Sequence, residues 1–97
     1  MDAAETHAWI FLSVPEQPGS VADIVAAADG INHAIPTQDE LSQSFRWLLK
    51  RGLVSRKGRR YALTDAGLTF RRRTSGSNIM KTWDLVAGDF RSDHTNI

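Results

Sequence analysis

The sequence predicts a single, mostly helical domain with one small β-hairpin. Three observations support this: 97 residues of which 41% are hydrophobic, apolar residues at helical spacing, and a glycine turn between two short strand-like segments. A chain of this length forms one domain with a modest core. We assign residues 1–73 to that domain. Residues 74–97 are expected to form a C-terminal helix and tail that pack on it or mediate dimerisation.

Two helices are expected before the proline at position 36. The apolar residues 7–14 fit a strand or a buried helix equally well over so short a length, and we interpret residues 4–14 as a helix ended by Pro15. The second helix begins after Ser20, whose hydroxyl can cap the first turn. Gly30 is expected to end it or to mark a local weak point. Its core stripe has i, i+3, i+4 and i+7 spacing and consists of Val21, Ile24, Val25 and Ala28.

The third helix, residues 37–51, has the strongest start signal in the chain. Thr37 and Glu40 have the spacing of a capping box, in which each side chain accepts a hydrogen bond from the backbone N–H of the other residue. Gly52 is placed to end this helix in the left-handed conformation. The expected buried stripe consists of Leu41, Phe45, Leu48 and Leu49.

A hairpin and two further helices are expected after Gly52. Residues 53–55 and 60–63 contain strand formers, and Lys57-Gly58 supplies the turn. Thr64 can cap a fourth helix over residues 65–73. A fifth helix is expected over about residues 78–87, with a frayed tail from Gly88 onward.

The charges are divided unevenly along the chain, although the net charge is only +1. Residues 1–45 contain seven acidic residues and no Lys or Arg, which gives −7. Residues 46–97 contain all twelve basic residues and four acidic ones, which gives +8. Such asymmetry favours a polyanion-binding surface in the second half. A solvated basic face is the alternative.

Three short segments of the sequence together resemble those of a known protein family. They are Thr37-x-x-Glu40-Leu41, residues 48–54, and Tyr61-Ala62-Leu63-Thr64-x-x-Gly67. They resemble the third helix, wing entry and post-wing segment of bacterial winged helix-turn-helix regulators, in the style of the MarR-like and PadR-like groups. The resemblance covers about residues 8–73. It implies a three-helix core with a two-stranded wing, and it places the third helix in the major groove of DNA.

The polar face of the third helix and the hairpin turn provide the candidate DNA contacts. Arg and Gln side chains can pair with guanine and adenine edges, whereas lysine near a helix end suits phosphates. Asp39 repels phosphate, unless it accepts from a cytosine amino group or only favours the helix N-terminus. Arg71, Arg72 and Arg73 add positive charge nearby in sequence. The candidate DNA-binding residues are Gln38, Ser42, Gln43, Arg46, Lys50, Arg56, Lys57, Arg59 and Arg60.

Each of these features also has an explanation that involves no binding partner. The helix face can simply be solvated, and the hairpin charges can protect an edge strand from aggregation. Trp9, Trp47 and Trp83 are more typical of a core or interface than of a cofactor site, and Trp47 flanks the polar face, where partial exposure is expected.

Several function classes find no support in the sequence. There is no cysteine, so no disulfide or thiolate metal site can form. We find no nucleophile–base motif, no phosphate-binding glycine loop and no metal-ligand spacing. We therefore expect no enzyme activity, no cofactor and no metal. With no apolar stretch long enough to cross a bilayer and no signal-peptide pattern, we expect a cytoplasmic protein without a membrane partner.

The leading hypothesis is a DNA-binding transcriptional regulator that acts on double-stranded DNA as a homodimer. The alternative is a winged-helix module that binds an acidic protein and no DNA. Dimerisation is expected chiefly through the C-terminal helix, since its apolar stripe lies outside the three-helix core; the stripe can instead fold back on the first helix of its own chain. The expected interface residues are Trp9, Ile79, Met80, Trp83 and Val86.

Overall fold

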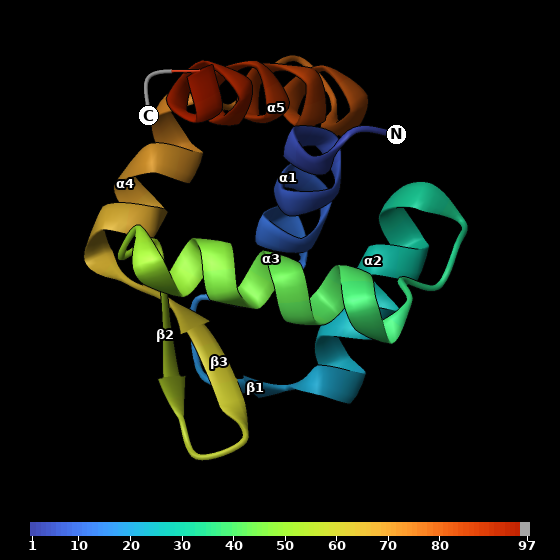
Figure 1. Ribbon diagram of the computed structural model, residues 1–97, viewed down its shortest axis with the longest axis vertical. Helices are drawn as coiled ribbons and strands as arrows, with labels where there is room; N and C mark the ends of the chain where they lie inside the picture. The colour runs from blue at the N-terminus through green and yellow to red at the C-terminus, as the bar shows by residue number, and fades with distance from the viewer. Residues whose placement is uncertain (96–97) are drawn as a thin grey trace.

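The computed structural model describes residues 1–95, and the side chains of residues 1–93. The described residues form five helices and one small antiparallel sheet, which lies at one end of the molecule (Figure 1), so the expected mostly helical fold is confirmed. The helices are α1 (Ala3–Ser13), α2 (Val21–Asn32), α3 (Gln38–Lys50), α4 (Asp65–Arg73) and α5 (Ile79–Thr95). The strands are β1 (Gly19–Ser20), β2 (Val54–Lys57) and β3 (Arg60–Leu63). None of the described helices is long and apolar enough to cross a membrane.

The starts of α2, α3 and α4 lie where their capping residues predict them, whereas the Asp2 cap of α1 was not predicted. The Thr37 hydroxyl accepts a hydrogen bond from the Glu40 N–H at 3.1 Å, and the Glu40 carboxylate accepts from the Thr37 N–H at 2.8 Å. Ser20 and Asp23 form the same reciprocal box at the start of α2, and Thr64 caps α4. These caps satisfy orphan N–H groups with side chains three residues away, so a local pattern fixes them.

The predicted hairpin is present, with its turn displaced by one residue. Lys57 pairs with Arg60, so Gly58 and Arg59 are the two central residues rather than Lys57 and Gly58. Gly58 has a φ of +61° and is the only one of the two with positive φ. A type II′ turn requires this conformation at its first central position, which is why glycine belongs there.

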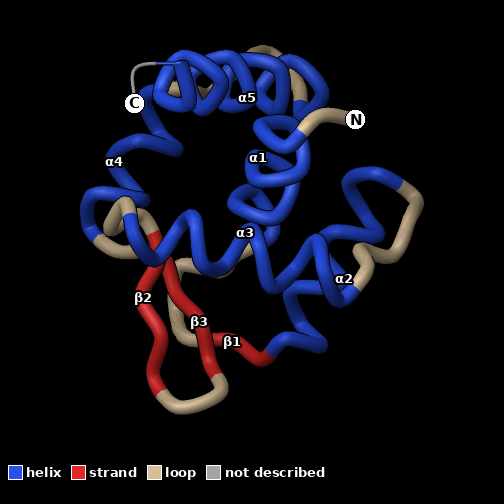
Figure 2. The backbone as a smooth tube through the Cα atoms, in the orientation of Figure 1, coloured by secondary structure: helices blue, strands red, loops and turns tan. Residues whose placement is uncertain are grey.

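A third strand was not expected from the sequence. β1 pairs antiparallel with β3, giving the sheet order β1-β3-β2 (Figure 2). The Leu63 N–H also donates to the Pro15 carbonyl at 2.9 Å. A two-residue strand shows no alternation of polar and apolar residues, so only its tertiary pairing defines it.

The core is built around α1, which contacts α2, α3 and α5. Trp9, Ile10 and Phe11 are almost completely buried, because neighbours cover this helix on several sides. The Trp9 indole N–H donates to the Ala28 carbonyl at 2.9 Å. The run that could have been a strand is therefore a central helix, as expected.

Two helices extend beyond their expected ends. α5 continues through Gly88 to Thr95, where a frayed tail was predicted, because Phe90 is only 2% exposed and packs in the core. Burial of one aromatic side chain outweighs the cost of about 1 kcal/mol for a helical glycine. α2 likewise continues past Gly30 and ends at Asn32, where the C-cap residue His33 has the left-handed φ of 53°.

The residues expected at a dimer interface fall into two groups. Trp9, Trp83 and Val86 are buried within their own chain, where α5 packs on α1. Ile79 and Met80 remain 45% and 54% exposed. The apolar stripe of α5 is thus largely used inside the single chain, which was the alternative left open by the sequence.

Candidate nucleic-acid interface

α3 lies across the front of the molecule, and its buried face fixes its orientation (Figure 1). Phe45 stacks on Tyr61 of β3 with ring centroids 4.0 Å apart, and Leu48 is completely buried. The Ser44 hydroxyl lies 2.8 Å from His7 Nδ1 of α1, and both side chains are buried. These contacts turn the opposite face of α3 to solvent.

All five candidate residues of α3 are exposed to solvent on that outer side. Within the described residues, Arg46 and Lys50 form no ion pair. Their charges are therefore available to an external partner. The exposed candidates are Gln38, Ser42, Gln43, Arg46 and Lys50.

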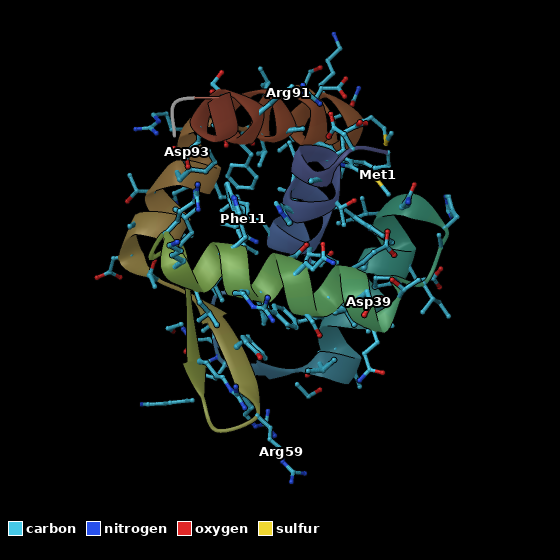
Figure 3. The ribbon with its side chains drawn as sticks, in the orientation of Figure 1. Met1, Phe11, Asp39, Arg59, Arg91 and Asp93 are labelled. Atoms are coloured by element: carbon cyan, nitrogen blue, oxygen red, sulfur yellow. The ribbon has the colours of Figure 1, made fainter. Side chains whose placement is uncertain are left out.

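The four basic residues of the hairpin are also exposed. Arg59 lies at the tip and points away from the body of the molecule (Figure 3). Arg56 is held locally, because its Nε donates to the Gly58 carbonyl at 2.7 Å and its guanidinium lies 5.9 Å from the Tyr61 ring. No ion pair in the described part of the chain involves Lys57, Arg59 or Arg60.

The arginine run at the end of α4 does not join the hairpin charges. α4 leads away from the hairpin toward α5 (Figure 1). Arg71 donates to the Val14 carbonyl at 2.9 Å and lies 4.0 Å from Glu16. Burial lowers the pKa of Arg71, and Glu16 partly opposes this effect. Nearness in sequence therefore did not translate into one continuous basic surface.

Arg51 and Trp47 also turn away from the exposed face of α3. Arg51 forms an ion pair with Asp93 of α5, and its guanidinium lies 3.9 Å from the centre of the Trp47 ring. Trp47 is half-buried and also stacks on His7, with centroids 5.0 Å apart. The i, i+4 spacing of Trp47 and Arg51 was the one sequence signal for their contact.

The two ends of α3 differ in charge. Asp39 is exposed at the first turn (Figure 3), and a groove of 270 Å³ beside it is lined by Asp2 and Glu40 as well. The free cations of α3 lie in its second half, near the hairpin, since α3 contacts β2. The positive surface thus consists of the second half of α3 together with the hairpin.

This arrangement can bind a polyanion along two elements at once. A helix face offers Arg, Gln and Lys side chains at turn spacing, and a projecting hairpin offers cations at its tip. No family model, no curated protein and no solved structure matches this chain.

Proposed function

We propose that this protein binds double-stranded DNA as a transcriptional regulator. In this proposal α3 enters the major groove, while the hairpin contacts the phosphate backbone or the minor groove. The observation that carries the proposal is a set of exposed cations without ion pairs in the described chain: Arg46, Lys50, Lys57, Arg59 and Arg60. Unpaired cations on adjacent elements are what phosphate binding requires.

The order of the elements supports the same proposal. The chain runs α1-β1-α2-α3-β2-β3, and β1 adds to the hairpin on the β3 side. This is the order expected of a winged helix domain, with α2 and α3 as the helix-turn-helix and the hairpin as the wing. The fold alone does not imply the function, so the exposed charges remain the main argument.

Different residues have different proposed roles. Arg46 projects from the middle of the outer face, and Gln43 lies at its side, where it lines the groove beside Asp39. Both side chains suit base edges, since they can form bidentate hydrogen bonds there. Lys50, at the end of the helix, suits a phosphate. Arg59 at the hairpin tip contributes a contact that is independent of sequence.

A titration with fluorescently labelled duplex DNA over a series of salt concentrations tests the proposal. The double variant R46A/K50A should weaken binding and reduce the log–log salt slope by about 1 for each phosphate that the variant no longer neutralises. The matched control R72A/R73A removes the same charge from the exposed end of α4 and should leave affinity almost unchanged. Lack of binding to any duplex at about 50 mM salt, or equal losses of affinity in both variants, would overturn the proposal.

Single variants separate specificity from affinity. R46A should lower the preference for a selected site over random duplex, because a bidentate base contact contributes about 1–3 kcal/mol of discrimination. R59A should weaken binding to all duplexes alike. If R59A lowered the preference for the selected site and R46A weakened all duplexes alike, the hairpin would read the bases and α3 would contact the backbone.

Asp39 favours a second candidate function. An exposed carboxylate at the start of α3 repels phosphates, and it suits a module whose basic hairpin binds an acidic protein instead. Asp39→Asn should strengthen DNA binding at low salt if the first turn of α3 approaches the backbone. Absence of DNA binding by both D39N and the unmodified chain would favour the protein-binding module.

A homodimer remains part of the proposal. Two-fold symmetric proteins place two recognition helices about one DNA turn apart. Because Trp9, Trp83 and Val86 are buried in their own chain, the contact surface must instead use exposed residues of α5 such as Ile79 and Met80.

A further inference from the structure

A groove of 490 Å³ lies where α3, α4 and α5 come together near their C-terminal ends. It is separate from the outer face of α3 and from the hairpin. Its volume falls within the range of roughly 300–1,000 Å³ that is typical of small-molecule sites. A second groove of 450 Å³ runs along α4 and shares Leu53, Phe70 and Arg73 with it.

The floor of the groove is apolar and aromatic. Leu53 and Phe70 are half-buried and line it. Phe90 lies beneath them, stacked near Phe70 with centroids 5.5 Å apart and with its own ring 4.6 Å from Trp47. His7 and Arg51 both lie against the Trp47 ring. Leu53 and Phe70 are only half-buried, so part of their apolar surface is open to the groove, which favours an apolar group.

The rim of the groove contains two cations and two anions, and only one cation and one anion form an ion pair with each other. Arg51 is paired with Asp93. Arg73 and Asp89 also line the groove, both are exposed, and neither forms an ion pair within residues 1–93. The Arg73 guanidinium lies over the Phe70 ring, 5.5 Å from its centre, so a cation is held beside the apolar surface of Leu53.

One unpaired guanidinium and one unpaired carboxylate beside an aromatic floor are complementary to a zwitterion. A ligand carboxylate can accept two parallel hydrogen bonds from Arg73, while an ammonium group donates to Asp89. We propose that this groove binds a small zwitterionic aromatic compound, of the class of a free aromatic amino acid. Its ring lies on Leu53 and Phe70. The inference is independent of DNA binding, and its test contains no DNA.

Calorimetric titration of the full chain with three matched probes tests the chemistry. L-Phenylalanine carries the ring and both charges, 3-phenylpropionate lacks the amine, and 2-phenylethylamine lacks the carboxylate. Phenylalanine should bind several-fold more tightly than either single-charge probe, since an exposed ion pair contributes up to about 1 kcal/mol. Equal affinities for all three, or no heat with phenylalanine at about 10 mM, would overturn the proposal.

Charge-neutralising variants show which rim residue binds the carboxylate of the ligand and which binds its amine. Arg73→Gln should weaken the binding of phenylalanine and phenylpropionate several-fold and leave that of phenylethylamine unchanged. Asp89→Asn should weaken phenylalanine and phenylethylamine and leave phenylpropionate unchanged. Arg72→Gln is the matched control, since Arg72 precedes Arg73, is exposed and does not line the groove. A loss of affinity in R72Q equal to that in R73Q, or no loss in either rim variant, would contradict the assignment.

Changes in amide chemical shifts locate the binding site independently of the variants. Phenylalanine should shift the signals of residues 51–53, 70–73 and 89–93, which surround the groove. Shifts confined to any other part of the chain would overturn the proposal even if binding occurred. Because the rim residues are exposed, circular dichroism should show that the variants are folded. If one variant fails to fold, titration of the unmodified chain with the three probes still tests the proposal.

Discussion

At the scale of single residues, Gly67 shows how close the backbone of α4 comes to Leu53, the residue before β2. A Cβ atom at this position would lie 1.9 Å from the Leu53 carbonyl oxygen. Gly67→Ala should therefore destabilise the fold by about 3 kcal/mol or more, because the overlap is with backbone that cannot rotate away. Chemical denaturation measures the change in the free energy of unfolding.

Gly88→Ala is the matched control for this substitution. Gly88 is also helical, but a Cβ there meets nothing within 4 Å. Alanine should stabilise α5 by up to about 1 kcal/mol, following helix propensity alone. Equal effects at the two glycines would mean that α4 does not approach Leu53 as described.

Asp23 makes the start of α2 sensitive to acid. The Ser20 backbone N–H donates to its carboxylate at 3.1 Å, and this bond, with the Ser20 hydroxyl, lowers the pKa of Asp23 below its ordinary value of 3.8. A lowered folded-state pKa means that the stabilisation is complete above the unfolded pKa and is lost as pH falls through the folded one.

Asp23→Asn should therefore reduce the loss of stability between about pH 5 and pH 2, measured as thermal midpoint against pH. Asp29→Asn is the control, because the Asp29 side chain forms no hydrogen bond or ion pair within the described residues. An unchanged acid response in D23N would contradict the role of this capping box.

At the scale of elements, α5 is a structural part of the core. Phe90 contacts the rings of Phe11, Phe70 and Trp47 at centroid distances of 5.6, 5.5 and 4.6 Å. Phe90→Ala should cost about 3–5 kcal/mol, as expected for truncation of a buried aromatic side chain. Leu85→Ala, at a position of the same helix that is 51% exposed, should change stability by less than about 0.5 kcal/mol. Similar small losses of stability in both variants would show that α5 is only loosely attached.

The elements differ in how well the sequence predicts them, and the difference has a physical cause. The starts of α2 and α3 follow from capping boxes, in which all partners lie within three residues. The length of α5 depends on where Phe90 packs, and β1 exists only through its pairing with β3. Those are contacts between distant segments, which periodicity and propensity do not report.

The same distinction applies to the candidate DNA-binding residues. Exposure of Arg46 and Lys50 follows from the helical period once Phe45 and Leu48 are placed in the core. The position of Arg71 does not follow, because its partner is the Val14 carbonyl, 57 residues away. Nothing in the local sequence distinguishes it from Arg72 or Arg73.

At the scale of the whole molecule, the homodimer is testable by mass and by salt dependence. If each protomer neutralises about four phosphates, a bound monomer should give a log–log salt slope near about −3.6 and a bound dimer a slope near about −7. Sedimentation equilibrium at micromolar concentration measures the mass without DNA. A monomeric mass together with the smaller slope would rule out the dimer, whereas Met80→Glu should dissociate it if the exposed end of α5 forms the contact.

The position of α5 has a practical consequence for measuring interactions. α5 caps the molecule at the opposite end from the hairpin, and Met1 lies near it (Figure 3). The Trp83 indole donates to the Glu5 carbonyl at 2.8 Å, so the start of the chain is fastened to that end. Met1 also lines the groove beside Asp39 together with Gln43. A tag fused at the start of the chain would therefore stand far from the hairpin tip but close to the first half of α3, and a binding assay should attach the protein at another position.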